Sequence, residues 1–184
     1  PTKEEERRGF VEQILPFVND PAMISVKLLG ENQVCLQVSD AYLSFAGETG
    51  IEVFFDFTWM KNAFIVDYLA ENLMEAGYTN GYLASFDGYT RNMDVRGREY
   101  TANIFDRMEN TISMPAQLTY TAPMSQVFLR NYPLSEEDRW HYYAYGDGTV
   151  TSIYLDQKTG MPVSSTDNLF SYSEDMGCAE LLMQ

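Results

Sequence analysis

The chain has 184 residues, of which 27 are Asp or Glu and 12 are Lys or Arg, so its formal net charge is −15 at pH 7. This balance excludes an ordinary nucleic-acid binder, because phosphates require a basic footprint, and it disfavours docking on an anionic membrane face. With 45% hydrophobic and 14% aromatic residues, the chain is too apolar for disorder, and we expect a single domain over 1–184 without a transmembrane segment.

The first third of the chain predicts a helix and a hairpin. Apolar residues recur at helical spacing over 3–19, which predicts a short helix in an N-terminal lead-in that covers 1–22. The strand-forming runs 24–29 and 33–38 flank Gly30-Glu31-Asn32, which is typical of a β-hairpin.

The middle of the chain predicts a β-α-β unit. Residues 51–57 are β-branched and aromatic, which indicates a buried strand. An apolar stripe over 59–77 predicts the clearest helix, with Thr58 as N-cap and Gly77 as C-terminal stop. A second buried strand is expected over 82–86, so the three elements together predict one right-handed crossover.

The rest of the chain predicts strands followed by a terminal helix over 173–183. The expected strands cover 100–105, 117–121, 127–132, 141–145 and 149–155. The last two flank Gly146-Asp147-Gly148 and are expected to form a hairpin. The predicted class is therefore α+β, with a mainly antiparallel sheet, one β-α-β crossover and a C-terminal helix.

Residue types limit the chemistry that the chain can support. His141 is the only histidine, lies in a predicted strand and more plausibly belongs to a sheet surface than to a catalytic triad. A bound metal would therefore be held by oxygen ligands, which favour Mg²⁺ or Ca²⁺. The cysteines Cys35 and Cys178 cannot form a disulfide framework, and the sequence leaves open whether they pair.

Polar loops at the ends of predicted strands are the candidate binding elements. Lys61 and the free N–H groups at the start of its helix would attract a phosphate, or Lys61 is simply solvated. Asp87 could hold a ribose hydroxyl or a cation, although Asp87-Gly88 also favours a tight turn. The loop 156–162 could embrace a phosphate or close a hairpin. Asp175 near the last helix could cap it or bind Mg²⁺.

Taken in order, these segments resemble the C-terminal two-thirds of the ApbE-like FAD:protein FMN transferases, from about Ile24 to the end. The first match is a predicted strand that ends at Asp56. Lys61-Asn62 then stands where the family has Lys-Gly-Tyr, and Val66-Asp67 matches the family's Val-Asp. Phe86-Asp87-Gly88 stands where the family has Gly-Gly-Asp. Residues 156–162 match its Asp-Pro-x-Thr-Gly-x-Pro, with Asp156 and Thr159 in place.

The resemblance implies a site for FAD and Mg²⁺ and an extracytoplasmic location, in a fold that lacks the family's usual N-terminal portion. Such enzymes cleave FAD with the help of Mg²⁺ and pass FMN to a threonine of a client flavoprotein. Carried over, the cofactor-binding residues would be Asp56, Lys61, Asp67, Asp87, Asp156 and Thr159, and the metal ligand would be Asp175.

The departures from the family pattern favour a degenerate, non-catalytic binding or scaffold module. The family's histidine before the loop is missing, Phe86 would crowd a phosphate, and Ala179 replaces the threonine of the metal pair. A protein partner could dock on the tyrosines of the 142–145 hairpin, although such rings often just cover a sheet. The alternative is a Mg²⁺-dependent FAD:protein FMN transferase. A third hypothesis, ranked last, is a small-molecule or cation sink that uses only the acidic surface.

Overall fold

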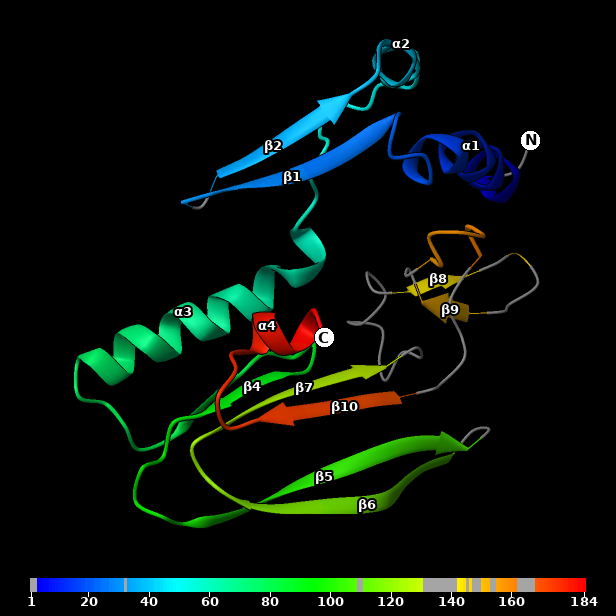
Figure 1. The fold of residues 1–184 in the computed structure, drawn as a ribbon. Coiled ribbons are helices and arrows are strands. Elements are labelled where there is room, and N and C mark those ends of the chain that lie inside the picture. The colour runs from blue at the N-terminus through cyan, green and yellow to red at the C-terminus, as the bar shows by residue number, and fades with distance from the viewer. Residues whose placement is uncertain are drawn as a thin grey trace. The chain divides into compact units, whose positions relative to one another are not determined.

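The computed structural model describes residues 3–31, 33–108, 111–130, 142–144, 146, 150–152, 155–161 and 168–184. Helices and strands are mixed, the strand pairs with a described register are antiparallel, and a short helix lies near the C-terminus (Figure 1). The predicted α+β class with a mainly antiparallel sheet is therefore confirmed. None of the helices in these ranges is both long and apolar enough to cross a membrane.

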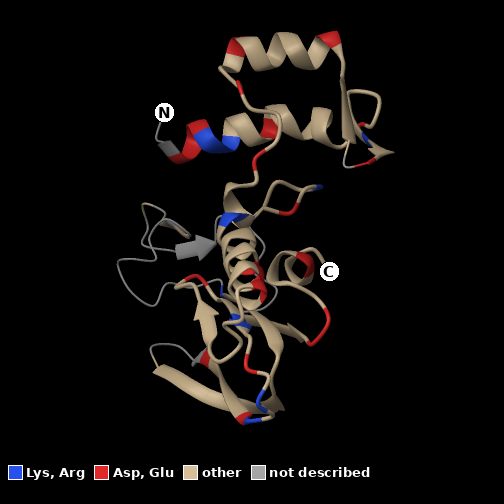
Figure 2. Cartoon of the chain, turned by 90° about the vertical axis from the view of Figure 1, so that its left-hand side faces the viewer, with Lys and Arg blue, Asp and Glu red and all other residues tan. Residues whose placement is uncertain are grey.

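Contacts divide the chain into two compact units, which we describe separately. The first unit comprises Pro1–Asp56 and Tyr143–Val163, and the second comprises Phe57–Tyr142 and Ser164–Gln184. Acidic residues are found in both units (Figure 2). A single ApbE-like domain over 1–184 stays a prediction.

The first unit begins with the helix and the hairpin that the sequence predicts. Helix α1 covers Lys3–Val18, and strands β1 (Ile24–Gly30) and β2 (Gln33–Val38) pair antiparallel. A second helix, α2 (Asp40–Thr49), was not expected. The Ser39 hydroxyl caps it by accepting a hydrogen bond from the Tyr42 N–H at 3.2 Å, which satisfies one of the free donors at the helix start.

Aromatic rings of α1 and α2 form the interior of the first unit. The Phe17 ring lies 5.0 Å from Phe45 and 5.4 Å from Tyr42, measured between centroids. Tyr42 is also 5.8 Å from Phe54 in the segment after α2. Aromatic pairs at these separations stabilise a core beyond the area that they bury. These rings therefore pack α1 against α2.

Residues 51–57 do not form the predicted strand, and the β-α-β crossover is wrong. They carry no strand hydrogen bonding, and side chains such as Val53 and Phe57 are exposed. Strand β3 (Tyr82–Ala84), which follows the long helix, pairs antiparallel with its successor β4 (Tyr89–Asn92). Strand propensity reflects fit to a half-buried sheet surface. Here no described neighbouring strand supplies that surface.

The second unit contains a four-stranded antiparallel sheet in the order β10-β7-β4-β3, and a separate hairpin. Strand β7 covers Met124–Arg130 and β10 covers Asn168–Ser173. The hairpin strands are β5 (Glu99–Met108) and β6 (Thr111–Thr121). Strands were thus correctly expected near 100–105, 117–121 and 127–132. The predicted buried strand at 82–86 is shorter than expected, and its Tyr82 is exposed.

Two further predicted elements are only partly described or partly correct. Strands β8 (Tyr142–Ala144) and β9 (Val150–Ser152) pair as expected, whereas His141 and Asp147-Gly148 of the turn lie outside the described residues. The terminal helix predicted for 173–183 is wrong at its start. Residues up to Ser173 belong to β10, and helix α4 covers only Cys178–Leu182, because β10 gains a full ladder with β7.

The long helix α3 (Lys61–Glu75) is preceded by a 3₁₀ turn, η1 (Thr58–Met60). Thr58 is therefore not its N-cap, since Met60 takes that position without a side-chain bond. Gly77 does end the helix, with φ at +87°. The Tyr78 N–H donates to the Leu73 carbonyl at 2.8 Å, and the Gly77 N–H donates to the Met74 carbonyl at 3.0 Å. This is a Schellman motif, which favours glycine at the left-handed position.

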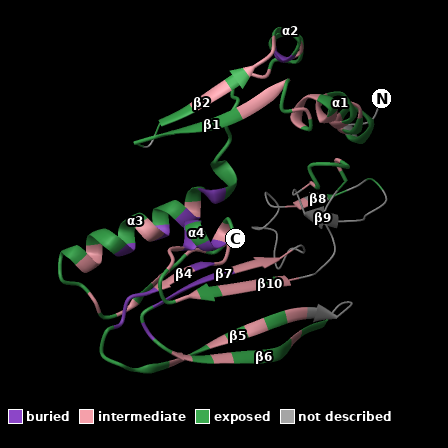
Figure 3. Ribbon diagram, viewed as in Figure 1, coloured by how far each residue is buried: buried purple, intermediate pink, exposed green. Residues whose placement is uncertain are grey.

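Helices α3 and α4 cover one face of the four-stranded sheet, and the core of the second unit lies between them (Figure 3). Val66 of α3 and Leu181 of α4 are buried against Tyr89 of β4 and Val127 of β7. Side chains alternate between the two faces of a strand. Gln126 directly precedes Val127 on β7, so its side chain points to the opposite face of the sheet, away from the helices.

The link between β4 and β5 is fixed by a buried carboxylate. Asp94 accepts hydrogen bonds from Arg96 Nη2 (2.6 Å) and Arg96 Nε (2.8 Å), and from the Tyr100 hydroxyl. The Arg96 guanidinium and then the Tyr100 hydroxyl hold the pKa of Asp94 well below its usual range. Paired in this way, the charge can be buried.

Both cysteines are free thiols, and we expect them to differ strongly in reactivity. Burial, and then the nearby Asp67 charge, raise the pKa of Cys178 to about 12. At pH 8 we expect 5,5′-dithiobis(2-nitrobenzoate) to label Cys35 in the folded protein, and both cysteines in 6 M guanidinium. The Cys35→Ala variant is the control that isolates Cys178. Rapid labelling of Cys178 in that folded variant would contradict its burial.

The same thiol adds a pH dependence of stability. The pKa of Cys178 in the folded protein lies above the ordinary value of 9.0. The contribution of the neutral thiol to the free energy of unfolding is therefore fully present below pH 9.0. It is lost as the pH rises from about 9 to about 12, because the unfolded thiol ionises first.

Candidate ligand-binding site

A pocket of about 510 Å³ lies between the four-stranded sheet and the β5–β6 hairpin of the second unit. Small-molecule sites commonly have volumes of roughly 300–1,000 Å³. The sheet contributes the face that is turned away from α3 and α4, and the hairpin contributes Ala102, Asn103, Phe105 and Ile112. The other lining residues come from the sheet and its β3–β4 turn: Ser85, Phe86, Gly88, Thr90, Gln126, Phe128, Arg130 and Phe170.

Strand β7 places an amide, an aromatic ring and a guanidinium in a row along this pocket. Gln126, Phe128 and Arg130 alternate with the inward-facing Val127 and Leu129. Each is about 7 Å from the next, because two residues of a strand rise by that distance. The Phe128 ring meets Phe170 of β10 edge to face, with centroids 6.2 Å apart. The row therefore has an aromatic centre with a polar group on each side.

Gln126 is the most unusual polar group of the pocket. The residue is only 8% exposed, and within the described ranges its Nε2 atom has no hydrogen-bond acceptor. A buried amide nitrogen carries two donors, and leaving them unmatched costs about 1–3 kcal/mol. A ligand with an oxygen acceptor would remove this cost. The side chain is thus placed to recognise such a group.

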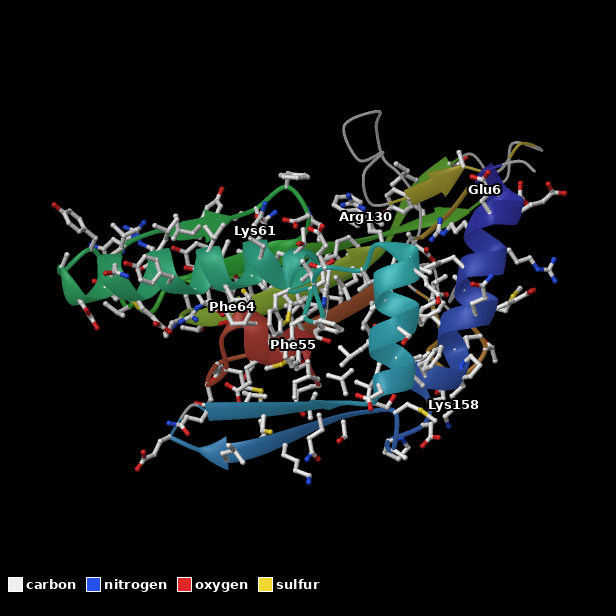
Figure 4. The ribbon with its side chains drawn as sticks, turned by 90° about the horizontal axis from the view of Figure 1, so that it is seen from above. Glu6, Phe55, Lys61, Phe64, Arg130 and Lys158 are labelled. Atoms are coloured by element: carbon white, nitrogen blue, oxygen red, sulfur yellow. The ribbon has the colours of Figure 1, made fainter. Side chains whose placement is uncertain are left out.

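Arg130, the last residue of β7, lines the pocket, and Figure 4 labels its side chain. It is the charged member of the lining, and it already takes part in another interaction within the protein. Its register partner on β10, Asn168, donates to Asp106 Oδ1 at 2.7 Å. Because a guanidinium has five N–H donors, Arg130 can bind an acceptor in addition to an existing partner.

Asp87 and the start of α3 are in contact beside the pocket. Asn62 Nδ2 donates to Asp87 Oδ2 at 2.8 Å, and Asp87 Oδ1 is buried without a partner in the described part of the chain. Asp87 lies in the β3–β4 turn between two pocket residues, Phe86 and Gly88. Lys61 is exposed at the first position of α3 (Figure 4). The structure thus joins Asp87 to the residue after Lys61.

Asp67 is held by partners inside the second unit. Its carboxylate accepts hydrogen bonds from the N–H groups of Cys178 and Ala179, both at 2.8 Å, and from Arg91 Nη1 at 2.9 Å. The two amides begin α4, so Asp67 of α3 acts as a tertiary cap on that helix. The predicted cofactor residue therefore fixes the packing of α4.

The remaining predicted site residues lie in two places. Asp56, Asp156 and Thr159 belong to the first unit. The Asp156 carboxylate accepts from the Thr159 hydroxyl (2.8 Å) and N–H (2.7 Å), and these bonds lower the pKa of Asp156. Asp175 is exposed in the second unit, and its N–H donates to the Ser173 hydroxyl at 3.1 Å. Such hydrogen bonds between a side chain and groups two or three residues away stabilise tight turns.

Sequence reasoning did not find the pocket residues on β7 and β10. The available signal was the alternation of Gln126, Phe128 and Arg130 with Val127 and Leu129, which indicates a strand that is occupied on both faces. Among the described residues no group of three or more His, Cys, Asp or Glu side chains could hold a metal ion. Scans against protein-family models, curated proteins and solved structures give no match for this chain.

Proposed function

We propose that the chain is a non-catalytic binding module that holds a small molecule in the pocket of its second unit. The observation that carries this proposal is the buried Gln126 Nε2, which has no described acceptor on the wall of an aromatic pocket. Apolar walls with a few convergent polar groups are typical of ligand sites. The polar lining consists of amides, hydroxyls and one guanidinium, all of which can bind a ligand by hydrogen bonds.

A pocket-filling variant tests this proposal. Ala102 lines the pocket, whereas Thr101 is exposed on the other face of the same strand. We expect saturation-transfer NMR with a set of flat aromatic fragments, FMN and FAD included, to detect binding to the wild type and to Thr101→Trp. Binding should be lost in Ala102→Trp. If no compound binds the wild type, or if both variants lose binding equally, the pocket is not a ligand site.

A second candidate function is a Mg²⁺-dependent FAD:protein FMN transferase that modifies a client flavoprotein. It is supported by two contacts between segments that resemble family motifs, Asn62 with Asp87 and Asp67 with Ala179. Such an enzyme would pass FMN to a threonine hydroxyl and release AMP. Incubation with FAD and a threonine-containing acceptor peptide, with and without Mg²⁺, separates the two functions. Mg²⁺-dependent release of AMP, lost in Asp87→Asn, would contradict a non-catalytic module.

A further inference from the structure

We infer that the pocket selects a flat aromatic carboxylate whose opposite end carries a neutral oxygen acceptor. This inference rests on the proposed function and specifies the class of ligand. Three residues on one face of β7 carry it: Phe128 lies between Gln126 and Arg130, and all three line the pocket. A ligand that covers Phe128 therefore meets a different donor at each of its ends.

The centre of the row selects a flat, aromatic body. Phe128 and Phe170 meet edge to face, and Phe86 and Phe105 add two further rings to the lining. Aromatic rings prefer offset stacking or edge contacts with other rings. An aromatic ligand can make both kinds of contact here, whereas an aliphatic chain would gain only the burial of its surface.

The two ends of the row select different acceptors. Arg130 carries a planar array of five donors that fits a carboxylate, and the donors that its existing partner does not use can bind one. Gln126 Nε2 is a neutral donor, buried and unmatched in the described part of the protein. It gains most from a neutral oxygen such as a hydroxyl or a carbonyl.

The spacing of the row sets the length of the ligand. Gln126 and Arg130 are four residues apart on one strand, so their Cα atoms are about 13 Å from each other. Both side chains are long and can shorten this span. A two-ring body with oxygens at opposite ends suits the remaining distance, whereas a single ring would reach only one donor.

The test uses three related probes with the full chain. The probe 6-hydroxy-2-naphthoate carries both acceptors, 2-naphthoate lacks the hydroxyl and 2-naphthol lacks the carboxylate. Affinities are measured by titration calorimetry, and circular dichroism confirms that each variant is folded. We expect Gln126→Leu to weaken 6-hydroxy-2-naphthoate about tenfold, the worth of one good hydrogen bond. Binding of 2-naphthoate should change less than twofold.

The complementary variant addresses the other end of the row. Arg130→Met should weaken both naphthoates about tenfold and leave 2-naphthol unchanged, and Arg130→Lys should restore part of the loss. If Gln126→Leu weakens both naphthoates equally, or if none of the probes binds the wild type, the inferred ligand class is wrong. The proposed function is judged separately, by whether any fragment, FMN or FAD binds the wild type and by whether Ala102→Trp alone abolishes that binding.

Discussion

Replacing Asp67 by alanine is expected to lower the free energy of unfolding by about 3 kcal/mol or more. The change leaves Arg91 without its described ion pair at a largely buried position and removes the acceptor for two α4 amides. Removing one partner of a buried ion pair typically costs about 3–5 kcal/mol, and a lost helix cap adds about 1 kcal/mol. Urea unfolding followed by circular dichroism measures the loss.

A matched control lies on the same helix. Glu71 is exposed one turn along α3, so Glu71→Ala removes a carboxylate without touching α4 and should change stability by less than about 0.5 kcal/mol. Hydrogen exchange adds a local measurement, because the amides of Cys178 and Ala179 should lose protection in Asp67→Ala. If Asp67→Ala is as stable as the control, the tertiary cap does not hold α4 in solution.

The same residue illustrates how far the sequence could be read. The apolar stripe on α3 predicted the helix correctly, because its period depends on the local chain alone. The role of Asp67 depends on a segment more than a hundred residues away, at the start of α4. No local pattern identifies such a partner. For that reason the family resemblance could suggest a cofactor ligand, which stays a prediction, but could not reveal the contacts by which Asp67 caps α4.

The missing strand at 51–57 has a related cause. Its residues have the composition of a strand, but a strand also requires a neighbour that supplies hydrogen bonds and covers one face. Conversely, no helix or strand was predicted for 168–172, yet 168–173 form β10 because β7 offers a complete antiparallel ladder. Pairing over long sequence separations was decisive in both cases.

The pocket could not be assigned from the sequence for the same reason. Phe128 and Arg130 were placed in a predicted strand without their faces being known, whereas Gln126 and Phe170 were not placed in a strand at all. The pocket exists because the β5–β6 hairpin lies opposite one face of the sheet in which β7 pairs with β10 and β4. Only the segment Phe86-Asp87-Gly88 was singled out beforehand, and the structure puts it in the β3–β4 turn at the pocket's edge.

Replacing Gly88 by alanine should be among the most destabilising single changes in the second unit. Gly88 has φ at +103°, and an added Cβ would lie 2.0 Å from the Phe128 carbonyl oxygen. The Gly88 carbonyl also accepts a hydrogen bond from the Phe128 N–H at 2.9 Å. Backbone strain of this kind costs about 1–3 kcal/mol and overpacking about 1–3 kcal/mol, so we expect a loss of roughly 4 kcal/mol in urea unfolding.

The control for this change is Gly97→Ala, which separates backbone strain from the clash. Gly97 also has a positive φ, +69°, but an added Cβ there would meet no atom within 4 Å. It should lose only about 1–2 kcal/mol, the cost of the left-handed conformation. Equal losses in the two variants would mean that the β3–β4 turn does not press on β7. A larger loss at Gly88 would show that this turn fixes the backbone of Phe128, and with it the aromatic centre on which the inferred ligand rests.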